Sequence, residues 1–463
     1  MPDNILLIVA DDHGQWALGS YGNREIRTPT LDYLAQSGVQ MDNAFTPTPV
    51  CSPARANLLT GRLASQHGIH DYLASNDPPV RDHDWLAGET TLPELLRDAG
   101  YQTALVGKWH LGNEEQPLPA FERWFSLSSD YPVEQSGPIR YSDQGRLTTV
   151  TGYQTDVITA QALQVLRESE QDRPFFLYVS YTGTHHPWHG HPQRLVSAYR
   201  HCTFDDIPDD VMYPFGRQNL ESTFATRRDE REALAQYYAS VSHIDESAGR
   251  LLNELDTLGL RDDTLVVYTA DHGLNCGHHG IWGKGNGTLP LNMVEESIRV
   301  PLLFNHPGRL FSGQRRREFV DHLDLFQTIA GFAGLSLPDR DSDYYPGRSF
   351  LPLLENSAAL HDWRTVQFGE YGNLRMIRTQ FYKLVRRYPD GPCELFDLWH
   401  DPRETINLFD DPSFGDVVER LTEQLEAYFD RYEDVQNSGL NVLNLPRHND
   451  TEAWRTVVAD PNQ

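Results

Sequence analysis

Three nearly continuous apolar runs constrain the fold of this chain most strongly. They cover residues 5–10, 175–180 and 264–270, and each is followed within a few residues by charged or imidazole side chains. Apolar runs of this kind are typical of strands that are buried on both faces of a parallel sheet. A fourth strand is predicted where Tyr101, Thr103 and Leu105 alternate with other residues. The sequence therefore predicts an α/β fold with a large, mostly parallel central sheet flanked by helices.

Chemically active side chains follow each of these four predicted strands. They are Asp11 and Asp12, Lys108 and His110, His185, and Asp271 and His272. In open α/β sheets the ligand lies outside the carboxyl ends of the strands, so we expect these side chains to converge on one rim. Adjacent carboxylates repel each other and favour a bound cation. Each residue taken alone is equally compatible with a solvated loop or a structural role.

The stretch Cys51-Ser52-Pro53-Ala54-Arg55 predicts a short helix with a cysteine just ahead of it. We expect Ser52 to be the N-cap, Pro53 to take the first helical position and Gly61 to end the helix. Cys51 would then face unpaired N–H groups at the positive end of a helix dipole, which favours an anion and lowers the pKa of a thiol. A buried free cysteine ahead of a capped surface helix is the alternative interpretation.

The charge of the chain limits its partners. A net charge of −27, from 39 basic and 66 acidic residues, argues against nucleic acid and against anionic membranes. An anionic substrate must therefore be captured by a local cluster of cations.

The four cysteines are far apart and include no CxxC pair, which argues against a disulfide framework or a structural zinc site. No apolar run approaches the length of a membrane span, and the short N-terminal run follows Asp3 instead of a basic region. We therefore expect a cytoplasmic protein without a secretory signal. The sequence gives no expectation for the oligomeric state.

The pattern of the chain changes near Leu360. Short runs with hairpin spacing follow it, and a helix is predicted from about 417 to 432. We expect a catalytic α/β domain over residues 1–360 and a small C-terminal subdomain of antiparallel sheet plus helix over residues 361–463.

These motifs together resemble the type I, formylglycine-dependent sulfatase family within the alkaline phosphatase superfamily. Cys51-Ser52-Pro53-Ala54-Arg55 matches the signature Cys-x-Pro-x-Arg of the family, and Thr60-Gly61-Arg62 continues it. The remaining motifs occur in the order of the family, over essentially the whole chain: Asp11-Asp12, Gly107-Lys108-Trp109-His110, Asp271-His272-Gly273 and Gly283-Lys284.

The resemblance implies that a formylglycine-generating maturation enzyme oxidises Cys51 to formylglycine. The hydrate of this aldehyde would supply the attacking hydroxyl, and its second hydroxyl would let the covalent intermediate collapse and release sulfate. A divalent cation, Ca²⁺ or Mg²⁺, would be held by Asp11, Asp12, Asp271 and His272 together with the group derived from Cys51. Many family members have asparagine in place of His272, so the choice of metal stays open.

The resemblance also implies roles for the basic side chains of the site. Arg55 would hold the hydrated aldehyde, and Lys108 and Lys284 would bind the sulfate. His110 would accept a proton, and His185 would protonate the leaving alcohol, either alone or together with Lys284. The family motif around the leaving-group histidine is commonly Pro-His-x-Pro, whereas Thr184 precedes His185 here, so His186 is a competing assignment.

Sulfate ester hydrolysis is the leading interpretation, with a sulfated saccharide or an aryl sulfate as substrate. The alternatives are a phosphodiesterase or phosphonate monoester hydrolase on the same scaffold, and a non-catalytic anion-binding protein in which Cys51 remains a thiol. The residues that could line a pocket for the sugar or aryl group are His67, His70, Asp71, Tyr72, Trp188, His189 and Asn286. A short or end-on substrate suits the acidic chain better than a long polyanion.

Overall fold

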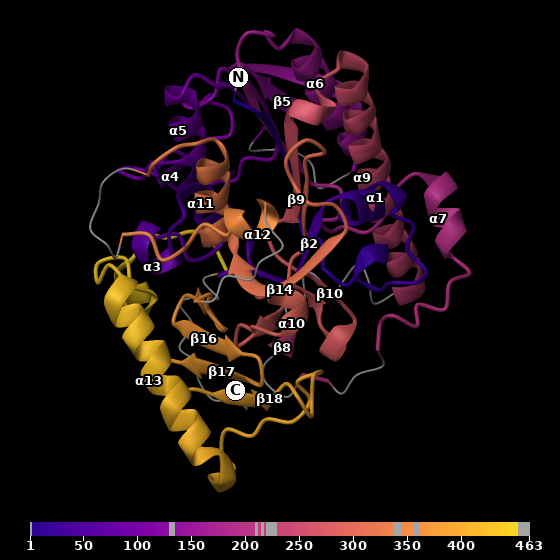
Figure 1. The fold of residues 1–463 in the computed structure, drawn as a ribbon. Helices are drawn as coiled ribbons and strands as arrows, with labels where there is room; N and C mark the ends of the chain where they lie inside the picture. Colours follow the sequence, from indigo (N-terminus) through magenta and orange to yellow (C-terminus); the bar gives the residue numbers. More distant parts are fainter. Residues whose placement is uncertain are drawn as a thin grey trace.

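A ten-stranded mixed sheet forms the centre of the molecule (Figure 1). The computed structural model describes residues 2–128, 135–208, 212–213, 217–218, 229–337, 344–355 and 362–451. The strand order of the large sheet is β14-β2-β13-β9-β1-β7-β3-β4-β5-β6. The strands are β1 (Asn4–Ala10), β2 (Val39–Phe45), β3 (Gln102–Gly107), β4 (Arg123–Leu127), β5 (Ser136–Asp143), β6 (Arg146–Tyr153), β7 (Phe175–Tyr181), β9 (Thr264–Ala270), β13 (Leu302–Asn305) and β14 (Gln314–Asp321).

The middle of this sheet is parallel, as the apolar runs predict. β1 pairs in parallel with β7 and β9, and β3 pairs in parallel with β7 and β4. Antiparallel pairs occur toward the edges, where β13 joins β9 to β2 and the β5–β6 hairpin extends the sheet beyond β4. The predicted α/β class with a mostly parallel central sheet is confirmed.

Helices cover both faces of the sheet, and the side chains of β1 divide between them. Ile5, Leu7 and Val9 pack in a cluster with α2 (Cys51–Thr60), α5 (Leu92–Asp98) and α11 (His322–Phe332). Leu6 and Ile8 pack on the other face with α1 (Pro29–Ser37), α6 (Gln154–Glu168) and α9 (Glu230–Leu258). Each face of β1 is therefore buried, which explains why its sequence lacks polar alternation. No helix in the described part of the chain is long and apolar enough to cross a membrane.

The C-terminal part of the described chain forms a second, smaller sheet with one long helix. Its antiparallel strands are β15 (Val366–Tyr371), β16 (Leu374–Thr379), β17 (Tyr382–Arg387) and β18 (Glu394–Asp397), and α13 (Gly415–Tyr432) packs against them (Figure 1). The predicted antiparallel sheet with one helix is thus present. Residues 356–361 lie outside the described residues, so the domain boundary at 360 stays a prediction.

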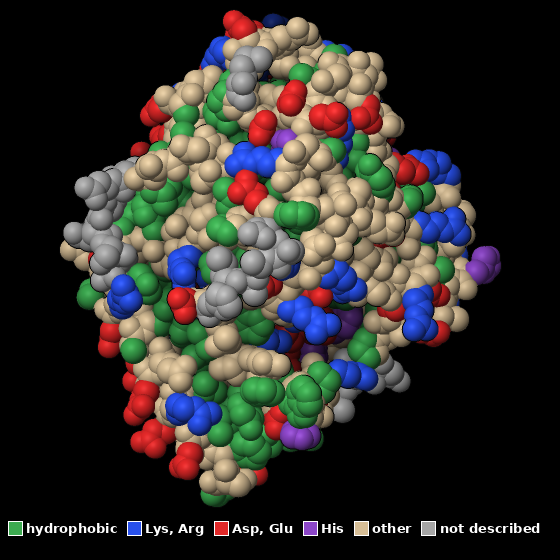
Figure 2. Space-filling model, in the orientation of Figure 1, with side chains coloured by type: hydrophobic (Ala, Val, Ile, Leu, Met, Phe, Trp, Pro, Cys, Tyr) green, Lys and Arg blue, Asp and Glu red, His purple; other side chains and the backbone are tan. Residues whose placement is uncertain are grey.

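Short elements occupy the connections between these layers. They are α3 (Ala64–His67), α4 (Pro78–Arg81), α7 (Gln193–Tyr199), β8 (Arg217–Gln218), β10 (Asn275–Cys276), β11 (Trp282–Gly283), β12 (Thr288–Leu289), α10 (Glu295–Ile298) and α12 (Leu351–Glu355). The surface seen in Figure 2 carries acidic side chains dispersed among basic ones, with no broad basic area on this face. This agrees with the expectation that basic groups for an anion lie inside a local site.

Candidate active site

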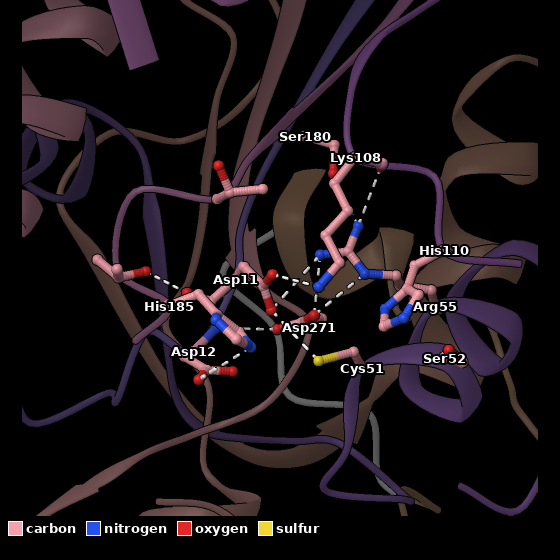
Figure 3. Close-up of polar contacts among 12 residues, drawn as sticks. Asp11, Asp12, Cys51, Ser52, Arg55, Lys108, His110, Ser180, His185 and Asp271 are labelled. Atoms are coloured by element: carbon pink, nitrogen blue, oxygen red, sulfur yellow. Dashed lines mark hydrogen bonds and ion pairs between the residues drawn. The ribbon is translucent and has the colours of Figure 1, made fainter. Parts of the chain in front are cut away.

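The ends of β1, β3, β7 and β9 meet at one edge of the large sheet, because these strands are parallel and adjacent. The N-terminus of α2, which carries Cys51, reaches the same place (Figure 3). Lys284 joins it from the loop after β11, with its Nζ 2.9 Å from Cys51 Sγ. The structure thereby brings together the ten predicted site residues: Asp11, Asp12, Cys51, Arg55, Lys108, His110, His185, Asp271, His272 and Lys284.

The start of α2 differs from the prediction. The helix begins at Cys51 and not after it, and Val50 is the N-cap without a side-chain bond. The prediction that Ser52 caps the helix is therefore wrong: its hydroxyl accepts a hydrogen bond from the N–H of Leu73, at 3.0 Å, and ties the helix to the loop that follows α3. Gly61 ends the helix in the left-handed conformation, as expected (φ 67°).

Three buried carboxylates form one side of the site. The side chains of Asp11, Asp12 and Asp271 are at most 2% exposed. The carboxylate of Asp271 accepts hydrogen bonds from the N–H groups of Asp12 (3.2 Å) and His272 (2.9 Å). Asp12 has a left-handed backbone (φ 61°), a conformation rarely adopted outside glycine. Such strain persists only where surrounding contacts enforce it, and it is common at functional sites.

His272 completes this cluster. Its Nε2 lies 3.2 Å from Asp12 Oδ1 and 3.4 Å from Cys51 Sγ. Its Nδ1 donates to the carbonyl of Gly273, so Nε2 is the nitrogen that faces the carboxylates. Burial alone would lower the pKa of His272, but the charge of Asp271 raises it to about 9.

The donor set fits a divalent cation. Ligand atoms of Asp11, Cys51, Asp271 and His272 lie within 4.8 Å of one another, and so do those of Asp11, Asp12, Cys51 and His185. Each set offers two carboxylates, and carboxylate oxygens are the donors that a hard cation such as Ca²⁺ or Mg²⁺ prefers. Burial and Asp11 raise the pKa of Asp271 to about 7. Positive charge nearby is therefore needed to keep these carboxylates ionised.

Two lysines provide part of that charge. Lys108 Nζ lies 2.5 Å from Asp11 Oδ2, and Lys284 Nζ lies 2.5 Å from Asp12 Oδ1. Lys284 Nζ is also only 2.9 Å from Cys51 Sγ. Burial would raise the pKa of the Cys51 thiol, but the two lysines hold it well below its usual range. Position 51 is therefore a place where negative charge is stabilised.

Arg55 anchors the site from the next turn of α2. Its Nε and Nη2 both donate to Asp271 Oδ2, at 3.1 and 2.9 Å. Its Nη1 donates to Ser180 Oγ at 2.7 Å and to the carbonyl of Lys108 at 3.3 Å. The guanidinium thus joins three strand ends beneath Cys51, and its side chain is 1% exposed.

The two predicted catalytic histidines differ in their surroundings. The Nε2 of His110 donates to the carbonyl of Leu73 (3.0 Å), whereas its Nδ1 has no hydrogen-bond partner among the described residues. Burial and Lys108 lower the pKa of His110 to about 4, so its ring is neutral and Nδ1 carries a lone pair. Cys51 interacts with this ring.

His185 is the more basic of the two. Its side chain is 22% exposed, its Nε2 lies 4.0 Å from Asp12 Oδ2, and its Nδ1 donates to the carbonyl of His186. Burial would lower the pKa of His185, but Asp12 raises it above its usual value. The adjacent His186 has its ring centroid 4.3 Å away, and burial together with His185 holds the pKa of His186 well below its usual value.

Most of the side chains that could line a substrate pocket have structural contacts instead. The ring nitrogen of His67 accepts from the N–H of Ile69, His70 donates to the carbonyl of Asn437, and Trp188 donates to the carbonyl of Thr184. Asp71 accepts from the hydroxyl of Tyr371 (2.5 Å). His189 is exposed, and Tyr72 and Asn286 are partly buried.

Sequence reasoning missed several polar residues that support the site. Ser180 and Tyr178 reach Arg55 from β7, and Thr184 donates its hydroxyl to the carbonyl of Asp11. The alternation of a strand places residues 178 and 180 on one face, and this signal was available. Glu114, which binds the backbone of His110, had no comparable signal.

Comparisons with known proteins identify the family of the chain. The sulfatase family model matches residues 3–335, and a model of the N-sulphoglucosamine sulphohydrolase C-terminal region matches residues 277–431. The chain is 28% identical to the N-acetylglucosamine-6-O-sulfatase of Bacteroides thetaiotaomicron, over 93% of this chain and 87% of that protein. It is 30% identical to human N-acetylgalactosamine-6-sulfatase, over 96% and 88% of the two chains.

A solved structure extends the likeness to the fold. The structure of BT4656 in complex with its substrate D-glucosamine-2-N,6-O-disulfate superposes with a TM-score of 0.80 and 26% identity, over 93% of this chain and 98% of that chain. A small antiparallel C-terminal sheet beside a large, mostly parallel one is thus shared with a protein that binds a sulfated sugar. The chain belongs to the sulfatase family and is a sulfuric ester hydrolase.

Proposed function

We propose that this sulfatase releases sulfate from a sulfated saccharide, with formylglycine at position 51 as the source of the nucleophile. The observation that carries the proposal is the setting of Cys51, whose Sγ lies 2.9 Å from Lys284 Nζ and 3.4 Å from both Asp11 Oδ1 and His272 Nε2. Residue 51 thus lies between a cationic side chain and candidate metal ligands. This position would stabilise an anionic nucleophile as it approaches a sulfate group. A maturation enzyme that oxidises Cys51 is the partner that this proposal requires.

The metal would be held by Asp11, Asp12, Asp271 and His272, together with residue 51. When bound, a divalent cation lowers the pKa of a coordinated hydroxyl and offsets the charge of the sulfate oxygens. We assign Ca²⁺ in preference to Mg²⁺, because Ca²⁺ tolerates more ligands and less regular geometry than the strict octahedron of Mg²⁺.

Lys108 and Lys284 would hold the sulfate group. Lys108 Nζ lies 2.5 Å from Asp11 Oδ2, and Lys284 Nζ lies 2.5 Å from Asp12 Oδ1. Each is fixed before the substrate arrives, so charge that develops on the sulfate oxygens is stabilised without reorganisation. Arg55 would fix Asp271 and the end of β3 through its hydrogen bonds, and it thereby holds the metal ligands and Lys108 in place.

The two histidines would divide the proton transfers. The neutral ring of His110, with a free lone pair on Nδ1, would accept a proton from a hydroxyl at residue 51. His185 would donate a proton to the oxygen of the departing alcohol, because its pKa is raised and its side chain is 22% exposed. His186 fits this role less well, since its lowered pKa keeps it unprotonated.

For the substrate we propose the 6-sulfate of a hexosamine at the end of a chain. Two relatives are named as 6-sulfatases of N-acetylglucosamine and N-acetylgalactosamine, and the substrate in the BT4656 complex carries a 6-O-sulfate. The nucleophilic position is 2% exposed, which favours a narrow terminal group, and the net charge of −27 disfavours a long polyanion.

The test measures sulfate release by ion chromatography from protein made with a formylglycine-generating enzyme. We expect faster turnover of N-acetylglucosamine 6-sulfate and short 6-sulfated oligosaccharides than of internal sulfates in the matching polymer. As controls, the sulfate, phosphate and phosphonate esters of the same aryl alcohol are compared. Because the leaving group is identical, their rates show which type of ester the enzyme prefers. Faster hydrolysis of the phosphonate than of every sulfate ester would contradict the proposal.

A further inference from the structure

A single buried glutamate fixes the backbone that carries His110. Glu114 is fully buried, and its Oε1 accepts a hydrogen bond from the N–H of His110 at 3.0 Å. The carbonyl of Glu114 in turn accepts from Trp124 Nε1 and from the hydroxyl of Ser126. The glutamate is therefore anchored to β4 while its side chain reaches back to the loop after β3.

The backbone of His110 needs such support. Its φ is 61°, in the left-handed region that residues with a Cβ rarely adopt. The N–H of His110 would point into a buried loop without a partner if the Glu114 carboxylate were removed. The bond to Glu114 therefore stabilises the backbone conformation in which the imidazole reaches the site.

That conformation also decides which ring nitrogen faces the nucleophile. The Nε2 of His110 donates to the carbonyl of Leu73, which can only accept, so the proton of the neutral ring sits on Nε2. Nδ1 then carries the lone pair, has no hydrogen-bond partner among the described residues, and belongs to a ring that interacts with Cys51. If the backbone of His110 relaxed, its imidazole would lose both the hydrogen bond to Leu73 and the orientation that turns Nδ1 toward residue 51.

We propose that Glu114 is a positioning residue for the sulfatase reaction, which holds His110 so that Nδ1 is presented to residue 51. The inference rests on the proposed role of His110 as proton acceptor. Glu114 itself does not touch the reacting atoms: its contribution passes through the N–H of one residue. A misplacement of about 1 Å in a catalytic group can cost about 100-fold in rate, so the effect belongs in kcat and not in KM.

The experiment compares variants of Glu114 on an activated aryl sulfate, in protein with formylglycine at position 51. E114Q keeps an oxygen that accepts the His110 N–H and should retain kcat within about threefold. E114M has similar volume without an acceptor, and kcat should fall about 10- to 100-fold with KM changed less than about twofold. E114D keeps the charge but is one methylene too short to reach the His110 N–H, so it should behave like E114M. It takes the place of E114M in the comparison if the methionine variant does not fold.

The neighbouring glutamate provides a matched control. Glu115 lies on the same loop, but its carboxylate accepts from the hydroxyl of Ser128 and not from His110. E115M should leave kcat unchanged. An equal loss in E115M and E114M would overturn the proposal, because it would trace both losses to a general loosening of the loop.

A double-mutant cycle separates this role from a merely structural one. In the H110A background E114M should cause no further loss of kcat, since the histidine through which it acts is gone. A further loss of the same size in that background, or wild-type kcat in E114M when H110A is impaired, would overturn the inference about Glu114 alone. Wild-type kcat in H110A would overturn the proposed role of His110 and the inference with it.

Discussion

Replacement of Arg55 by lysine tests the buried network that joins the strand ends. Lysine keeps the positive charge beside Asp271, but a single ammonium cannot also reach Ser180 Oγ and the carbonyl of Lys108, which Arg55 Nη1 contacts at 2.7 and 3.3 Å. Hydrogen bonds to charged groups contribute about 1.5–3 kcal/mol each. The loss of two should destabilise the protein by about 3–6 kcal/mol, close to the cost of about 3–5 kcal/mol for breaking a buried ion pair.

The assay is urea unfolding at pH 7, followed by tryptophan fluorescence, with kcat measured on the same samples. R55K should lower the unfolding midpoint by the equivalent of about 3 kcal/mol or more at an unchanged m-value, and it should lower kcat because Asp271 loses its support. Arg167 is the control, since its pair with Glu254 is exposed and R167K should change nothing. A loss in R55K below about 1 kcal/mol would refute the reasoning.

Three further perturbations test separate parts of the site. K284A should fold normally by circular dichroism yet lose about 100- to 1,000-fold in kcat on an aryl sulfate, because the ammonium beside residue 51 is gone; unchanged kcat would remove Lys284 from the site. Calcium added after chelation should restore turnover and raise the melting temperature of the wild type, whereas D271A should show neither effect. Burial lowers the pKa of His70 to about 4, so the unfolded state binds its proton first as pH falls below about 6.5. Stability should therefore drop by about 2 kcal/mol between pH 7 and 5 on account of this group, and H70Q should show a correspondingly flatter urea midpoint against pH.

The sheet and the rim of the site were predictable because their causes are local in the sequence. Doubly buried strands leave continuous apolar runs, and parallel neighbours must end at the same edge. That geometry alone brings Asp11, Lys108, His185 and Asp271 together, without any knowledge of their side-chain contacts. The alternation of β7 also contained the information that places Ser180 beside Arg55.

The errors arose where a contact joins parts of the chain that are far apart. Ser52 has the composition of an N-cap, but its hydroxyl binds the N–H of Leu73 instead, 21 residues away. The N–H of His70 donates to the ring of His448, and its own ring donates to Asn437, so the C-terminal segment covers this histidine. No local pattern specifies such pairs, and the positive φ of His110 has no signature either, since that conformation is enforced by its surroundings.

The central claim is that residue 51 acts as formylglycine, and mass spectrometry of the tryptic peptide that spans residues 28–55 tests it most directly. The protein is produced with and without a formylglycine-generating enzyme, and the fraction of aldehyde at position 51 is compared with kcat on an aryl sulfate. The account predicts that kcat rises in proportion to the aldehyde fraction and is lost in C51A. Full activity in protein whose Cys51 remains wholly a thiol would contradict it.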